Sequence, residues 1–228
     1  MRFNCSLALF TPPAATGLSV AAIIAIERDR WLITLGGYDE ARPGRTMAQF
    51  RDICARLPDP FPRAVREDAL ADVAAYHHAD NRRRDFAALP DFPARLVSVG
   101  DAVTSFNPVY GQGMTSAALQ AACLSEYLTA SPDLAAPARS FFARQQVVVD
   151  AAWSVSAGGD MARQDAANGA EVPGDVRRRR EATEQILRAT AVDPAVAAAF
   201  EDVAYMMAHP DTLADPGLIE RAVAANAR

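Results

Sequence analysis

Lysine is absent from this sequence, so all 23 basic residues are arginine, and with 28 acidic residues the net charge is −5. A chain with this negative balance is a poor candidate for nucleic-acid binding, which depends on neutralising phosphates. The absence of lysine and the many alanines are typical of a GC-rich genome and indicate little about function.

Cysteine is scarce, and the three thiols of Cys5, Cys54 and Cys123 are far apart in the sequence. They form no CxxC pair and no disulfide framework. This usage favours a reducing cytoplasm over secretion. Each cysteine is more simply interpreted as a small buried hydrophobic residue than as a reactive thiol.

Histidine is equally scarce. His77 and His78 are adjacent, so in a strand they would point to opposite faces, where they could not chelate one metal ion, and His209 is distant. No Ser-His-Asp or Cys-His arrangement is recognisable, which argues against a hydrolase. The sequence therefore predicts no metal site.

Long hydrophobic runs are also missing. The longest, 18–26, is far too short to cross a bilayer, and Pro12 and Pro13 interrupt the apolar start before a signal-peptide core is complete. Half of the 228 residues are apolar, enough to bury a core in one large domain or two small ones. We expect a soluble globular protein.

The first half of the chain mixes strand and helix signals. The apolar runs 18–26 and 31–35 flank a charged turn and predict a β-hairpin. Thr46 is a suitable N-cap for a helix over 47–57 with apolar residues at helical spacing. Further elements are expected as a short helix at 63–71 and strands at 73–77 and 96–99.

The second half is Ala-rich and amphipathic, with prolines close to the expected helix starts. We therefore predict an α+β fold, with a small sheet in the first half and an all-helical C-terminal half. The expected helices are 112–130, 135–157, 176–190, 194–208 and 215–226.

The segment 95–122 carries most of the chemical information. Asp101 follows an expected strand and could accept hydrogen bonds from a polyol, while Pro108 offers a rigid apolar surface for a flat ring. Gly111 and Gly113 allow close backbone approach, and the following helix start offers N–H donors and a positive dipole end. The positive end of the helix dipole would suit a ring that becomes anionic when it is reduced. By composition alone, an ordinary tight turn explains the same glycines.

The ordered sequence GDAVTSFNPVYGQGMTSAALQA (residues 100–121) resembles the second FAD-binding motif of the aromatic-hydroxylase-like flavoprotein monooxygenases. The resemblance implies that Asp101 binds the ribityl chain and that Pro108 lies near the isoalloxazine. It also implies that backbone amides reach the pyrimidine side of the ring from the next residues: Gly111, Gln112, Gly113, Met114 and Thr115.

Some positions depart from that pattern. Thr104 stands where many members have His, Thr115 replaces a frequent Asn, and Gln120 replaces a frequent Asp. The Gly-Met-Thr form is similar to the squalene-epoxidase-like branch, which implies an apolar substrate rather than a phenol.

The resemblance also implies a domain arrangement. Residues 1–90 would be part of a substrate-binding sheet domain, 91–130 a strand–loop–helix of the FAD-binding domain, and 131–228 a C-terminal helical region. Only residues 99–121 are diagnostic.

The family's N-terminal GxGxxG unit, which holds the ADP end of FAD, is not found; the pairs Gly36-Gly37 and Gly158-Gly159 lack its context. We therefore expect weak or no FAD binding by this chain alone, and a separate chain carrying the Rossmann segment is one possible partner.

The functional hypothesis is an FAD-dependent oxidoreductase or monooxygenase, or a truncated form of one, acting on an apolar or aromatic small molecule with NAD(P)H and O₂. No catalytic side chain is assigned. The alternatives are a non-catalytic remnant that does not hold FAD, and a flavin reductase or dehydrogenase on the same scaffold.

Other conspicuous residues have two interpretations each. The arginines at 82–84 are either a solvated stretch or contacts to a cofactor phosphate, and solvation is favoured. Those at 177–180, with acidic neighbours, favour a salt-bridged exposed helix face over a nucleic-acid patch. Trp31 and Tyr110 are candidates for lining a substrate pocket, with Tyr110 the better placed.

Overall fold

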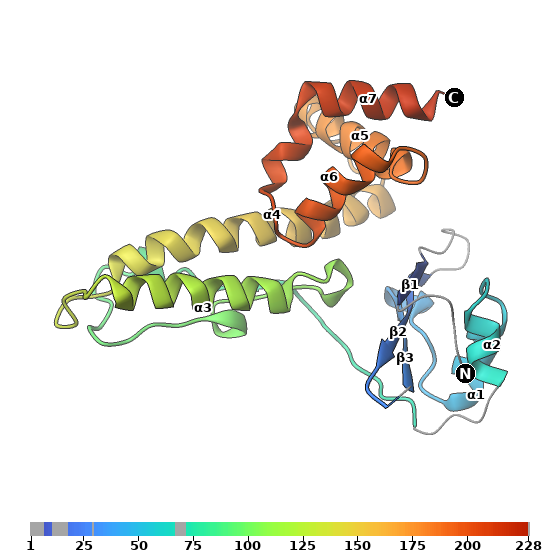
Figure 1. Cartoon of the computed structure of the whole chain (residues 1–228), viewed down its shortest axis with the longest axis horizontal. Helices are drawn as coiled ribbons and strands as arrows, with labels where there is room; N and C mark the ends of the chain where they lie inside the picture. Colours follow the sequence, from blue (N-terminus) through green and yellow to red (C-terminus); the bar gives the residue numbers. More distant parts are fainter. Residues whose placement is uncertain (1–6, 11–17, 29, 67–71, 228) are drawn as a thin grey trace. The chain divides into compact units, whose positions relative to one another are not determined.

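The computed structural model describes residues 7–10, 18–28, 30–66 and 72–227. Over these residues the fold is α+β, with small antiparallel sheets and a mainly helical C-terminal half (Figure 1). The predicted fold class is therefore confirmed. Cys5 lies outside the described residues, as do the end of the expected helix 63–71 and most of the N-terminal apolar stretch.

The chain forms two compact units, residues 1–77 and 78–228, and each is described by itself. Residues 78–90, which the sequence analysis grouped with the sheet region, lie in the second unit.

The first unit contains a three-stranded antiparallel sheet, in which β2 (Leu18–Ile26) lies between β1 (Leu7–Phe10) and β3 (Arg30–Gly37). The predicted hairpin is confirmed: β2 and β3 pair with Ile23 opposite Ile33. A further strand, which the sequence analysis did not predict, pairs along β2 with Leu7 opposite Ile24.

Two helices complete the core of the first unit: α1 (Met47–Ala55) and α2 (Phe61–Arg66). Thr46 begins α1 with a capping box, because its side chain accepts from the amide of Gln49 and the Gln49 side chain accepts from the amide of Thr46. The buried core combines residues from the sheet, the helices and the turn between them: Leu18, Ala21, Ile23, Cys54, Leu57 and Phe61.

The second unit is organised around two long helices that lie side by side, α3 (Gly113–Thr129) and α4 (Arg139–Asn168) (Figure 1). An irregular segment with the aromatic residues Phe86 and Phe92 packs on them, and the Phe92 ring meets Phe142 edge-on at 4.8 Å. The two-residue strands β4 (Arg82–Arg83) and β5 (Thr104–Ser105) pair antiparallel and tie that segment to the loop before α3.

A cluster of shorter helices completes the second unit. Asp193 and Asp215 cap α6 and α7, each followed by a proline at the first helical position, as the proline pattern predicted. Their common core is Ile186, Ala189, Val196 and Ala222. The helices are α5 (Gly174–Ala189), α6 (Pro194–Ala204) and α7 (Pro216–Asn226).

Three of the sequence-based predictions were wrong. Residues 73–77 and 96–99 are not strands. Val99 has extended backbone angles, but residues 96–99 pair with no strand in the described chain, and an extended segment without a partner forms no sheet. The helix expected at 135–157 runs on to Asn168 and ends at Gly169, whose φ of 61° gives the left-handed C-terminal cap.

None of the helices in the described parts of the chain combines the length and apolar character needed to span a membrane.

Candidate functional site

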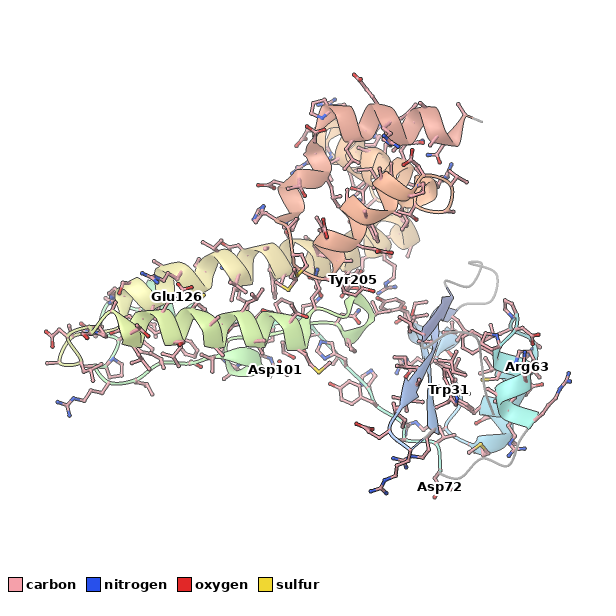
Figure 2. All side chains as sticks on the ribbon, viewed as in Figure 1. Trp31, Arg63, Asp72, Asp101, Glu126 and Tyr205 are labelled. Carbon is pink, nitrogen blue, oxygen red and sulfur yellow. The ribbon has the colours of Figure 1, made fainter. Side chains whose placement is uncertain are left out.

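The Gly-Asp-Ala turn lies against the side of α3. It forms a single 3-10 turn, Gly100–Ala102, in which Gly100 has a φ of 62°. The amide of Gly100 donates to Oε1 of Gln120 at 2.9 Å. Figure 2 shows Asp101 beside α3, and its side chain is exposed. The turn therefore presents a free-standing carboxylate next to the helix predicted to face the flavin.

Arg84 holds this turn from the other side. Its guanidinium donates to the carbonyl of Ala102 at 3.0 Å and, more weakly, to that of Asp101 at 3.5 Å, while its amide donates to Val103. Arg83 forms an ion pair with Asp150 at 2.7 Å. Arg82 and Arg84 are exposed, and Arg83 and Arg84 also make contacts that hold the local fold, a role that the sequence analysis did not assign to this run.

Buried amide side chains connect the turn to both long helices. Gln120 donates to Ser116 at 3.1 Å, and Gln145 of α4 donates to Gln120 and to the carbonyl of Ser98. All three of these polar side chains are almost fully buried. Gln120, noted as a departure from the family pattern, therefore has a structural role here.

The loop before α3 is a second 3-10 turn, Pro108–Tyr110. Asn107 caps it by accepting from the amide of Val109, and Gly111 closes it with a φ of 72°. Pro108 and Gly111 are exposed, and a Cβ added at Gly111 or Gly113 would meet nothing within 4 Å. The loop thus leaves open space beside its backbone.

The first turn of α3 begins with unsatisfied amides. In the part of the chain that the structure describes, the N–H groups of four consecutive residues have no acceptor; the first amide with one is Ser116, bonded to the carbonyl of Gln112. Met114 is 87% exposed and Thr115 is half-buried. Free N–H groups at the positive end of a helix dipole favour an acceptor or an anion. The four residues whose N–H groups have no acceptor are Gln112, Gly113, Met114 and Thr115.

Asp160 on α4 anchors the loop, and the sequence analysis did not assign it this role. Its carboxylate accepts from the side-chain amide nitrogen of Asn81 at 2.7 Å, from that of Asn107 at 3.0 Å, and from the Tyr110 hydroxyl at 3.2 Å. Asn81 in turn accepts from the backbone of Asn107 at 2.7 Å and from Ser156. This network fixes the path of the chain from Asn107 to Tyr110.

Other candidate residues lie elsewhere. Trp31 packs against the core of the first unit, whereas Tyr110 binds Asp160. In the arginine run at 177–180, Arg179 forms an ion pair with Asp175 and Arg180 forms one with Asp165. Ion pairs were predicted for this run, but the acidic partners are these aspartates rather than the adjacent glutamates. Among the described residues, no group of His, Cys, Asp or Glu side chains could hold a metal ion.

The two described cysteines are unpaired. Cys54 is fully buried in the first unit, and desolvation raises the pKa of its thiol from 9.0 to about 11. Burial, and then the charge of Glu126, also raises the pKa of Cys123. Thiols shifted in this direction are poor nucleophiles at neutral pH, which favours the interpretation of both as packing residues.

No family model matches the chain. Its sequence is similar to Protein Rv3254 of Mycobacterium tuberculosis (strain ATCC 25618 / H37Rv), with 34% identity over 146 residues, which cover 61% of this chain and 30% of that protein. The chain therefore spans less than a third of the curated relative that it matches, and the name of that relative states no activity.

Proposed function

We propose that this chain supplies the isoalloxazine- and ribityl-binding part of an FAD-dependent oxidoreductase of the monooxygenase type. The observation that carries the proposal is the row of four free amides at the start of α3, next to Gly111, where the backbone borders open space. A flat heterocycle with carbonyl and ring-nitrogen acceptors along one edge fits such a row.

Each part of the site would have one task. Asp101, exposed beside α3, would accept hydrogen bonds from the ribityl hydroxyls, and Pro108 would pack against the ring. The free amides from Gln112 to Thr115 would bind the pyrimidine edge, where the helix dipole favours the negative charge that reduction adds. The amide of Gly111 donates to the carbonyl of Pro108 at 3.0 Å, so Gly111 would contribute close backbone approach rather than a hydrogen bond. Asp160 would hold the loop in place, so the amides are oriented before the ring binds.

FAD would supply the electron transfer from NAD(P)H to O₂, and an apolar or aromatic small molecule would be the substrate. Residues of this chain would bind and orient the ring and keep water from one side of it. The ADP end requires a nucleotide-binding segment, carried by another chain or by another part of a longer protein. The unpaired thiols of Cys54 and Cys123 support the cytoplasm as its compartment.

The test is a titration of the full chain against riboflavin and against FAD, followed by flavin fluorescence anisotropy. Because the proposed contacts involve only the ring and the ribityl chain, we expect the two ligands to bind weakly and within about threefold of each other. Asp101→Ala should weaken both, and Glu126→Ala, a change of another exposed carboxylate on the second unit, should weaken neither.

Two results would oppose the proposal. If neither flavin binds at millimolar protein, the chain is the non-catalytic alternative. If FAD binds far more tightly than riboflavin, this chain holds the ADP end, and the assignment of its loop to the ring is wrong. Product analysis with oxygen uptake, on the chain combined with its nucleotide-binding segment, would separate a monooxygenase from a flavin reductase or dehydrogenase.

A further inference from the structure

A groove of about 180 Å³ lies in the second unit, and Asp101 is not among its lining residues. Its walls come from α3, α4, the end of α6 and the segment that follows α6, and its lining is mainly aliphatic and thioether side chains. Figure 2 marks the end of α6 with Tyr205, where this helix approaches α4. The lining residues that the argument uses are Gln112, Val147, Val203, Met206 and Met207.

Gln112 is the polar feature of this groove. Its side chain is only 2% exposed, and its Nε2 makes a long hydrogen bond of 3.5 Å to the carbonyl of Val203. Its Oε1 is buried and has no partner within the described part of the chain. Exchanging the two amide atoms would place the oxygen against the Val203 carbonyl, so a flipped side chain does not remove the problem.

A buried acceptor without a partner is unfavourable, and the penalty disappears when a donor reaches it. Because Oε1 has almost no exposed surface, a donor reaches it only when side chains of the lining move, and two of the lining residues are flexible methionines. Met206 has a φ of 59°, in the left-handed region, and Met207 is 79% exposed. The groove therefore combines an apolar lining, one acceptor in need of a donor and an adaptable rim.

We propose that this groove binds a small apolar molecule that carries one hydroxyl or N–H donor, with the donor directed at Gln112 Oε1. The volume sets the size of the ligand. Cavities of roughly 150 Å³ hold a single six-membered ring, and pockets for larger ligands measure about 300–1,000 Å³. A single ring or a short branched chain of about six to eight non-hydrogen atoms fits.

This site does not depend on flavin binding. The flavin proposal uses the backbone amide of Gln112 and residues beside it, whereas the groove uses the Gln112 side chain together with residues of α4 and of the end of α6 and the segment after it. Either site can therefore fail without the other.

The test uses the full chain with ¹³C-labelled methionine methyl groups, titrated with cyclohexanol and, separately, with methoxycyclohexane, which has no donor. We expect cyclohexanol to bind with a dissociation constant on the order of 1–10 mM and to shift the Met206 and Met207 methyl signals. Met47 and Met161, which do not line the groove, should not move. The ether should bind about five- to tenfold more weakly, because it leaves Oε1 unsatisfied.

Two variants separate the acceptor from the apolar lining. Gln112→Leu should remove the preference for the alcohol, so that both probes bind about equally. Val147→Trp fills the groove from a position that is 62% exposed, and should abolish binding of both probes without affecting the flavin titration. Leu128→Trp, at an exposed position on α3 outside the groove, is the matched control and should bind both probes normally.

The proposal is overturned if cyclohexanol leaves Met206 and Met207 unmoved at saturating concentration, which would indicate that water alone satisfies Gln112. It is also overturned if the two probes bind the natural chain equally, or if Val147→Trp binds them as well as Leu128→Trp does.

Discussion

At the residue scale, two neighbouring glycines of α4 have different roles. A Cβ added at Gly159 would lie 2.3 Å from the Tyr110 hydroxyl oxygen and 2.6 Å from two of its ring carbons, whereas one added at Gly158 would meet nothing within 4 Å. Gly159 is therefore needed for Tyr110 to reach Asp160. No comparable contact requires glycine at position 158.

Alanine substitutions at these two positions should change the stability of the second unit in opposite directions. Gly159→Ala should destabilise the second unit by about 1–3 kcal/mol, because the rigid Tyr110 ring must move and lose its bond to Asp160. Gly158→Ala should stabilise it by up to about 1 kcal/mol, since alanine favours the helix. Urea unfolding followed by far-UV circular dichroism measures both. Equal effects would mean that Tyr110 does not pack on α4.

The same residues show how far sequence reasoning reached at this site. One short stretch of sequence contains Asp101, Pro108 and the loop glycines, so it could be predicted that these residues lie at one site. Asn81 and Asp160 are 79 positions apart and share no local pattern, although they bond at 2.7 Å. Only the tertiary fold brings them together.

At the scale of single elements, the sequence predicted correctly those helices and strands whose stabilising interactions are made by residues close together in the sequence. Thr46 with Gln49 starts α1, and the apolar β2 with its charged turn forms a hairpin. A strand at 96–99 would have needed a second strand to pair with, and the residues 96–99 themselves do not show whether such a strand is present. The helix α4 continues through both glycines, because its packing with Tyr110 and its neighbours outweighs their weak helix propensity.

Burial of Cys54 between α1 and the sheet makes the first unit sensitive to alkali. Its thiol pKa is raised from 9.0 to about 11, so the folded state favours the protonated form. This contribution to stability is complete below pH 9 and is lost as the pH rises towards 11.

We expect the folded state to lose about 2 kcal/mol between pH 8 and pH 10.5 from this thiol alone. Urea unfolding monitored by Trp31 fluorescence, in a Trp153→Phe background, compares the natural residue with Cys54→Ala. Cys54→Ala lacks the thiol and should lose about 2 kcal/mol less stability than the natural protein on going to the higher pH. Parallel losses in the two proteins would contradict the burial of this thiol.

At the scale of the whole molecule, the second unit contains complete cores of its own. The aromatic cluster around Phe92 and Phe142 and the cluster around Ile186 and Val196 use residues of 78–228 alone. A fragment of residues 78–228 should therefore fold without the sheet unit. We expect a helical spectrum and a single cooperative thermal transition by circular dichroism; a gradual, non-cooperative loss of signal would show that the sheet unit is required.

The central claim is that the opening turn of α3 is a flavin-ring site, and amide NMR of the ¹⁵N-labelled full chain with riboflavin tests it most directly. The account predicts that the largest shifts fall on the free amides from Gln112 to Thr115 and that Asp101 responds with them. Shifts confined to other regions, or none at saturating riboflavin, would contradict it.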